Sequence, residues 1–156
     1  MSFTKAKTYL QKRGLGENVM EFDCSLATVV EAAVAVGCAS KQIAKTLSFL
    51  VGGEAVLVVV AGDCKIDNAK FKAHFATKAK MLDADVVEET VGHAVGGVCP
   101  FGVNENVAIY LDESLKRLDT LYPSCGSVNS AVKLTLAQLE EAVEFKAWVD
   151  VCRVVE

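Results

Sequence analysis

The feature that most constrains this chain is an unbroken apolar run over residues 55–61, which follows the glycine pair Gly52-Gly53. Before that pair, Ile43–Val51 alternates between apolar and polar residues, as a strand with one buried face does. Two glycines between such segments favour a tight hairpin turn. Because the second segment is apolar on both faces, we expect it to be a central strand of a sheet.

Helical and strand patterns are mixed in the rest of the chain. Helices are expected over residues 2–13, 28–37, 68–78, 83–92, 113–117 and 135–143. Further strands are expected over residues 19–22, 107–111, 120–122, 131–134 and 146–151. Hairpins and helices without sustained βαβ alternation predict one α+β domain over residues 1–156, with a curved, mostly antiparallel, barrel-like sheet surrounded by helices.

The composition allows a sizeable core in a single domain. The chain has 156 residues, of which 52% are hydrophobic and 23% charged, with a mean hydropathy of +0.33. Intrinsic disorder is therefore excluded. The longest apolar run is far shorter than the roughly 20 residues that a spanning helix needs, so no membrane association is expected. The N-terminal residues contain no apolar signal region, and we expect a cytoplasmic protein.

Charge is unevenly distributed along the chain. Sixteen Lys and Arg against twenty Asp and Glu give a net charge of −4, which excludes polyanion binding by bulk charge. Locally, basic residues dominate one segment that contains only Asp67 as an acid: Lys65, Lys70, Lys72, Lys78 and Lys80. This segment is either a phosphate-facing patch or a solvated helix face.

The cysteines follow no metal-binding spacing. No C-x-x-C pair occurs among Cys24, Cys38, Cys64, Cys99, Cys125 and Cys152, and the two histidines are not spaced as a ligand pair. We therefore expect neither a zinc site nor another metal or cofactor. Without a secretory signal the thiols are expected to be reduced, several of them as small core residues.

Lys45 is the first candidate for chemistry. In a strand it shares a face with Ile43 and Leu47, where the pattern calls for an apolar side chain. An ammonium group in that position must find partners, extend to water, or lose its charge. Two interpretations stand: a lysine that extends to solvent at the strand entrance, or a cleft lysine that binds an anionic or carbonyl-bearing substrate.

The second candidate is the glycine-rich stretch over residues 96–102, Gly-Gly-Val-Cys-Pro-Phe-Gly. Two glycines allow close backbone approach, and Pro100 stiffens the exit, so that N–H groups can point at a carbonyl oxygen. A tight turn between strands explains the same residues. No phosphate-binding glycine motif is present. Cys99 with His93 as its base defines a third possibility, a thiol enzyme or redox sensor.

Taken together, these segments resemble the YbaK/EbsC-type aminoacyl-tRNA editing domain, which also occurs within or beside bacterial prolyl-tRNA synthetases. The resemblance spans nearly the whole chain, and its most specific parts are the lysine strand and the G-x-x-x-P loop. The matching segments are residues 28–37 (TVVEAAVAVG), 42–49 (QIAKTLSF), 58–63 (VVVAGD), 92–102 (GHAVGGVCPFG), 110–115 (YLDESL) and 122–127 (YPSCGS).

The resemblance implies a trans-acting deacylase that hydrolyses the ester of a mischarged tRNA, with tRNA(Pro) carrying a small wrong amino acid such as Cys or Ala as the expected substrate. A prolyl-tRNA synthetase is the implied partner. The family's essential lysine maps onto Lys45. Its substrate-binding positions map onto Gly96, Gly97, Val98, Cys99, Pro100, Ser124 and Gly126. The nucleophile would be water or, in members specific for cysteine, the substrate's own thiol.

Three positions depart from the commoner family pattern and leave the amino-acid specificity open: His93, Cys99 and Ala131. A non-catalytic module that binds tRNA ends or a synthetase is the alternative function. For tRNA docking, the sequence predicts a contact with the acceptor stem through Lys70, Lys72 and Lys78 on a helix over residues 68–78.

Overall fold

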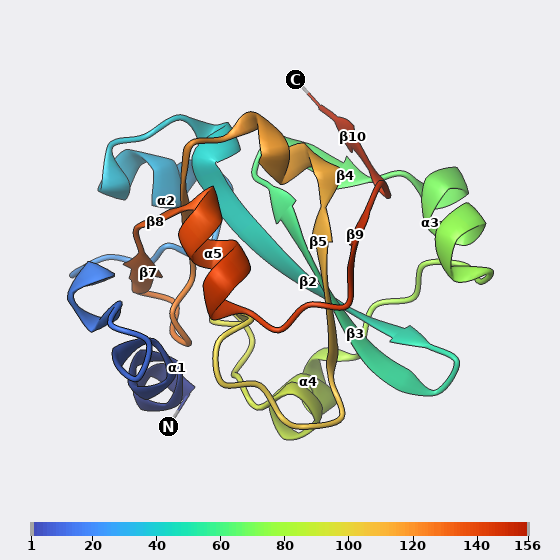
Figure 1. The fold of residues 1–156 in the computed structure, drawn as a ribbon, viewed down its shortest axis with the longest axis horizontal. Helices are drawn as coiled ribbons and strands as arrows, with labels where there is room; N and C mark the ends of the chain where they lie inside the picture. The colour runs from blue at the N-terminus through green and yellow to red at the C-terminus, as the bar shows by residue number, and fades with distance from the viewer. Residues whose placement is uncertain (1, 156) are drawn as a thin grey trace.

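A curled six-stranded sheet organises the computed structural model, which describes residues 2–155 (Figure 1). Its strand order is β8-β6-β2-β3-β5-β9. The strands are β2 (Ile43–Val51), β3 (Glu54–Ala61), β5 (Ala108–Asp112), β6 (Thr120–Pro123), β8 (Leu134–Thr135) and β9 (Ala147–Val149). Around the sheet lie the helices α1 (Ser2–Gln11), α2 (Val29–Val36), α3 (Asn68–Phe75), α4 (Ala84–Val91) and α5 (Leu136–Ala142). The α+β class and the curled sheet are confirmed.

The β2–β3 hairpin forms the centre of the sheet, as expected from its pattern. The two strands pair in antiparallel register from Ala44↔Ala61 to Val51↔Glu54, and both turn glycines adopt positive φ, 57° at Gly52 and 83° at Gly53. Every residue of β3 after Glu54 is buried. Strand β3 therefore contributes side chains to the packing on both faces of the sheet.

The sheet is mixed rather than mostly antiparallel. Strand β2 pairs with β6, β3 with β5, and β5 with β9 in parallel register, whereas β6 and β8 are antiparallel. Hairpin signals are local in the sequence, and parallel pairs join segments that are far apart in the chain. The prediction of a mostly antiparallel sheet is wrong because the sequence pattern of a strand does not reveal the direction of its neighbour.

Two small sheets were only partly predicted. Strand β1 (Val19–Glu21) pairs with β7 (Ser130–Val132), close to the predicted segments. The other sheet, β4 (Cys64–Ile66) with β10 (Cys152–Val154), was not expected. Both of its strands are three residues long and include an exposed Lys or Arg, so they lack a detectable apolar alternation.

Capping residues define the helix starts largely as predicted. The hydroxyl of Thr28 accepts a hydrogen bond from the Glu31 N–H at 3.1 Å, and Thr135 forms a capping box with Gln138. Helix α3 begins after Asp67 but ends at Phe75, because Ala76 adopts a left-handed conformation with φ of 60°. The expected helix over residues 68–78 is therefore too long, and Lys78 lies outside it.

Helix α3 packs against the central sheet through aromatic side chains. Phe71 and Phe75 of α3 form aromatic contacts with Phe49 and Tyr110, with ring centroids 4.8 and 5.2 Å apart for Phe49–Phe71 and Phe75–Tyr110. Figure 1 shows α3 at one end of the molecule and α1 and α2 at the other.

Within residues 2–155, no helix combines the length and apolar character needed to cross a bilayer.

One histidine is fully buried in this core. His93 is 0% exposed, and its Nε2 donates a hydrogen bond to the Phe101 carbonyl oxygen at 2.6 Å. The other ring nitrogen, Nδ1, is buried without a hydrogen-bond partner in the described structure. Burial lowers the pKa of His93 below its ordinary value of 6.5. The neutral imidazole is thus the form that fits the core.

We predict that His93 makes the fold sensitive to acid. Because its folded pKa lies below the unfolded value, the unfolded state binds more protons below pH 6.5, so stability is complete above that pH and is lost as pH falls. Urea unfolding measures the free energy of unfolding at pH 7.5 and at pH 5. The drop between these pH values should be about 1 kcal/mol smaller in His93→Gln than in the wild type. Replacing the exposed His74 serves as the control. Identical pH dependence in all three proteins would contradict this account.

Candidate functional site

A cavity of about 370 Å³ lies beside β2. Four of the predicted site residues line it, namely Lys45, Gly96, Val98 and Ser124. Its walls are mainly apolar, and the remaining lining residues are Leu26, Ala27, Thr28, Val29, Ile43, Ala44, Thr46, Leu47, Ser48, Met81, Leu82, Ala84, Val87 and Val95. Segments far apart in the sequence therefore meet at one concave site.

The cavity opens where one edge of β2 has no neighbouring strand. Pairing with β6 ends at Ala44↔Pro123. Pairing with the segment around Met81 begins at Ser48, whose carbonyl oxygen accepts the Leu82 N–H at 3.1 Å. Between these points, no ladder partner within residues 2–155 covers this edge of β2. Since main-chain groups alternate along a strand, the N–H and C=O of Thr46 face the same edge as those of Ser48.

Thr46 also carries a polar group without a partner. Its hydroxyl is buried and forms no hydrogen bond in the described structure, although other atoms of the residue line the cavity. A buried hydroxyl without a partner is uncommon and costs stability, so its presence calls for an explanation. No sequence signal marks Thr46, because a threonine in a strand is ordinary.

Lys45 is half-buried at the cavity and donates a hydrogen bond to the carbonyl oxygen of Cys64. Desolvation by burial lowers the pKa of Lys45 below its ordinary value of 10.5. The ammonium group has three donors, so the Cys64 carbonyl leaves two for other partners. The expectation of a lysine at a cleft is consistent with this geometry.

The glycines of the G-x-x-x-P loop have different roles. Gly96, with φ of 91°, lies at the cavity. Gly97 is buried against the main chain of Gly126 and Ser127, and a Cβ atom there would come within 2.4 Å of both residues. Gly97 and Gly126 therefore do not line the cavity as expected. Their close backbone approach holds the loop in place instead.

Cys99 and Pro100, two of the expected substrate-binding residues, are buried and are not among the residues that line the cavity. Cys99 is 0% exposed, and burial raises the pKa of its thiol far above the ordinary value. Its Sγ lies 3.5 Å from Nε2 of His93, but that nitrogen already donates to the Phe101 carbonyl. This environment does not support a thiol nucleophile.

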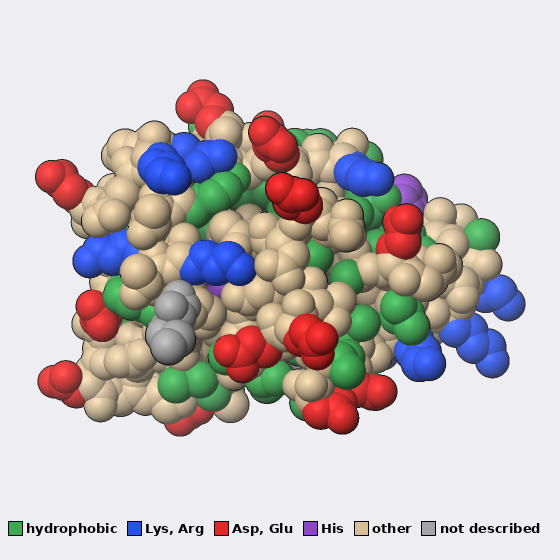
Figure 2. Space-filling model, turned by 90° about the horizontal axis from the view of Figure 1, so that it is seen from below, with side chains coloured by type: hydrophobic (Ala, Val, Ile, Leu, Met, Phe, Trp, Pro, Cys, Tyr) green, Lys and Arg blue, Asp and Glu red, His purple; other side chains and the backbone are tan. Residues whose placement is uncertain are grey.

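The three lysines predicted to contact tRNA lie away from the cavity lining. Lys70 forms an ion pair with Asp150 at 3.0 Å and donates to the Cys152 carbonyl at 3.1 Å. Lys72 and Lys78 are exposed. Figure 2 shows a group of Lys and Arg side chains at one end of one face of the molecule, and further basic side chains at the opposite end and centre with acidic ones between them. Side chains of both signs are therefore spread over this face.

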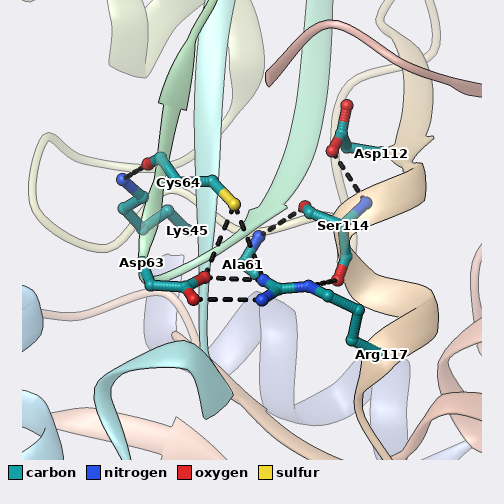
Figure 3. A network of polar contacts seen from close by, with 7 residues as sticks. All are labelled: Lys45, Ala61, Asp63, Cys64, Asp112, Ser114 and Arg117. Atoms are coloured by element: carbon teal, nitrogen blue, oxygen red, sulfur yellow. Dashed lines mark hydrogen bonds and ion pairs between the residues drawn. The ribbon is translucent and has the colours of Figure 1, made fainter. Parts of the chain in front are cut away.

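A polar network beside Lys45 was not predicted from the sequence (Figure 3). It joins Asp63 and Arg117, whose side chains form a two-pronged ion pair with N–O distances of 2.6 and 3.0 Å. Arg117 also contacts the thiol of Cys64 at 3.6 Å. The two ion-pair residues are 54 positions apart, and no local pattern connects them.

The chemistry that the cavity offers is limited in kind. Among the lining residues there is one ammonium group, several hydroxyls and main-chain groups, but no carboxylate and no imidazole. Within residues 2–155, no group of three or more His, Cys, Asp and Glu side chains is arranged to hold a metal ion. The site can bind and polarise a carbonyl-bearing, polar ligand, and Lys45 is the one lining side chain that can serve as a base, in its neutral form.

We predict that the backbone contact at Gly97 makes any side chain larger than hydrogen destabilising at this position. Gly97→Ala forces main-chain atoms apart and should lower the free energy of unfolding by about 1–3 kcal/mol. The matched control is Gly16→Ala, whose Cβ would come within 2.5 Å of Cγ in the flexible Gln11 side chain but no closer than 3.4 Å to backbone. That variant should change stability by less than about 0.5 kcal/mol. Equal stability of the two variants in urea unfolding would show that the backbone contact is not tight.

Comparison with known proteins agrees with this geometry. The family model of the aminoacyl-tRNA editing domain matches residues 24–142. The uncharacterized protein YwhH of Bacillus subtilis (strain 168) is 46% identical over 154 residues, covering 98% of both chains. A proline–tRNA ligase of Citrifermentans bemidjiense is 25% identical over 107 residues, which are 68% of this chain and 19% of the ligase.

The fold also matches a solved structure. The crystal structure of a candidate trans-editing enzyme for prolyl-tRNA synthetase superposes with a TM-score of 0.87 and 29% identity, covering 97% of both chains. The family match spans most of the chain, including the cavity strand, the glycine-rich loop and the turn at Ser124. The chain belongs to the aminoacyl-tRNA editing domain family.

Proposed function

We propose that this protein is a trans-acting aminoacyl-tRNA deacylase that hydrolyses the ester of mischarged tRNA. The substrate is tRNA(Pro) carrying a small wrong amino acid such as Cys or Ala, and the reaction takes place in the cytoplasm. The observation that carries the proposal is that Lys45, Gly96 and Ser124 line one cavity in a chain of the editing family. The match to part of a proline–tRNA ligase supports the choice of tRNA.

The reaction needs stabilisation of negative charge on the ester carbonyl oxygen. Main-chain N–H groups at the open edge of β2, in the cavity that Gly96 also lines, are suited to this, because the strand holds them in fixed directions. The two remaining donors of Lys45 hold the terminal adenosine or its phosphate, or polarise the ester. The nucleophile is water, or the substrate's own thiol where cysteine is removed.

The cavity walls indicate a small aminoacyl side chain. Ala44, Leu82, Val87 and Val98 form an apolar surface, and the volume of about 370 Å³ must also hold part of the ribose. Small apolar side chains are poorly discriminated by binding alone, which is why a separate hydrolytic site improves fidelity.

One observation favours the alternative, a non-catalytic module that binds tRNA ends or a synthetase. The cavity lining has no carboxylate and no imidazole, which leaves Lys45 as its one side chain that can act as a general base. The two functions differ in a direct assay, in which purified protein is incubated with tRNAs mischarged with Ala, Cys, Ser or Thr. Release of the amino acid supports the deacylase, whereas binding without release supports the module.

Binding of tRNA involves Lys72 and Lys78 in this proposal, with Lys70 beside them. The chain is acidic overall, so contact with the phosphate backbone has to come from a local group of lysines. A prolyl-tRNA synthetase is the proposed partner, because it could contribute tRNA selection that an acidic domain of this size lacks.

Lys45→Ala should reduce deacylation by at least about 100-fold, because it removes the only ammonium group at the cavity. The fold should remain intact, since loss of a half-buried charge relieves desolvation. The measurement is single-turnover release of the amino acid, together with thermal unfolding. Lys41→Ala, at an exposed lysine just before the same strand, is the control. Near-normal turnover by Lys45→Ala would contradict the catalytic role.

Charge reversal of Lys72 and Lys78 should raise KM for aminoacyl-tRNA about tenfold and reduce its salt dependence. Hydrolysis of a short aminoacyl-adenosine should not change, because that substrate does not reach the acceptor-stem surface. Lys70 is left in place to keep its ion pair with Asp150. Reversal of two other exposed lysines, Lys133 and Lys146, is the control. Equal losses on both substrates would indicate damage to the fold, and no loss would place the tRNA surface elsewhere.

A further inference from the structure

The ion pair between Asp63 and Arg117 lies next to the carbonyl group that holds Lys45 (Figure 3). Asp63 belongs to the turn between β3 and β4, and Arg117 is the last residue of the 3-10 helix η3 (Glu113–Arg117). Both Nη atoms of Arg117 reach the carboxylate, Nη1 to Oδ2 at 3.0 Å and Nη2 to Oδ1 at 2.6 Å. A two-pronged pair of this kind fixes orientation as well as distance.

A hydrogen bond within η3 also fixes the guanidinium group of Arg117. Its Nε donates to the carbonyl oxygen of Ser114 at 3.0 Å, one turn earlier in η3. The same Ser114 joins η3 to the central hairpin, because its hydroxyl accepts the Ala61 N–H at 3.1 Å. Arg117 therefore contacts the β3–β4 turn from a helix that is anchored at the end of β3.

Asp112 completes this anchor in the core. Asp112 is 1% exposed, and its Oδ2 accepts a hydrogen bond from the Ser114 N–H at 2.9 Å. The other oxygen, Oδ1, accepts the Val151 N–H at 2.9 Å. Both oxygens of a buried carboxylate thus hold main-chain groups, a rigid arrangement that ties η3 to the segment leading into β10 (Cys152–Val154).

On its other side the ion pair restrains Cys64. The thiol of Cys64 donates to Oδ1 of Asp63 at 3.4 Å and lies 3.6 Å from Nη2 of Arg117. The carbonyl of the same residue accepts the hydrogen bond from Lys45. A continuous set of contacts therefore runs from the buried Asp112 through Arg117 and Asp63 to the ammonium group at the cavity.

We propose that Asp63 and Arg117 are positioning residues that fix the Cys64 carbonyl and, through it, the ammonium group of Lys45, a residue that lines the cavity. This inference rests on the proposed function, in which Lys45 acts on the aminoacyl ester. The lysine side chain is long and flexible, and one fixed acceptor restricts it while leaving two donors for the substrate. A displacement of about 1 Å is enough to cost about 100-fold in rate.

The carboxylate keeps its charge over the range in which the site works. The hydrogen bonds from Arg117 hold the pKa of Asp63 below its usual value of 3.8, and the pair remains ionised at neutral pH. The side chains of Asp63 and Arg117 are 22% and 39% exposed, so the pair alone contributes little to overall stability. A positional role explains its elaborate support better than a role in stability.

The test compares three variants in single-turnover deacylation and in thermal unfolding. Asp63→Asn and Arg117→Met remove the two-pronged pair and should lower kcat/KM at least tenfold with small changes in Tm. Glu113→Gln is the matched control, because it breaks the 3.0 Å ion pair with Lys116 on the same 3-10 helix without touching the contacts to Lys45. It should retain wild-type activity.

A double-mutant cycle separates positioning from general damage. If Asp63 acts through Lys45, Asp63→Asn should cause no further loss in the Lys45→Ala protein. An equal loss in both backgrounds, or wild-type activity of Asp63→Asn, would overturn the proposal.

A second readout does not depend on catalysis. In protein labelled at lysine, the two Hε protons of Lys45 should give separate NMR signals, because the side chain is held. These signals should merge in Asp63→Asn and Arg117→Met but not in Glu113→Gln. Separate signals in all variants would overturn the positioning role. If no mischarged tRNA is deacylated by the wild type, the proposed function fails, while this experiment still decides whether the ion pair holds Lys45.

Discussion

The unequal pairing of β2 is the constraint on which the site depends. One edge of β2 is hydrogen-bonded to β3 along nearly its whole length. Within residues 2–155, the other edge is covered only at its two ends, by β6 and by the segment around Met81. The uncovered middle part of this edge of β2 presents main-chain donors and acceptors to the apolar-walled cavity. A rigid central hairpin can present such an edge because its stability comes from β3 and the core on either side.

The features that could be predicted are those encoded locally. The hairpin around Gly52-Gly53 and the place of Lys45 within it follow from alternation of apolar and polar residues over a few positions. The helix starts at Thr28, Asp67 and Thr135 follow from capping chemistry. Both kinds of signal lie within a few consecutive residues and do not depend on contacts between distant segments.

The features that could not be predicted depend on distant contacts. The parallel neighbours of β2 and β3, the β4–β10 pair and the Asp63–Arg117 ion pair all join segments far apart in the chain. The glycine-rich loop shows the same limit: its sequence indicates tight backbone contact, but only the fold reveals that Gly97 meets Gly126 while Gly96 faces the cavity. Cys99 belongs to a loop-like glycine-rich segment in the sequence and is enclosed by the core in the structure.

The most direct test of the central claim is a structure of the protein with a non-hydrolysable amide analogue of alanyl-adenosine. The account predicts the alanyl group against Ala44 and Val98, with its carbonyl oxygen between the Gly96 main chain and Lys45 at the open edge of β2. Binding in the open groove between α1 and α4, which is lined by Lys5, Arg13 and Glu89, would contradict it. So would an analogue at the cavity whose carbonyl points away from both Lys45 and the loop.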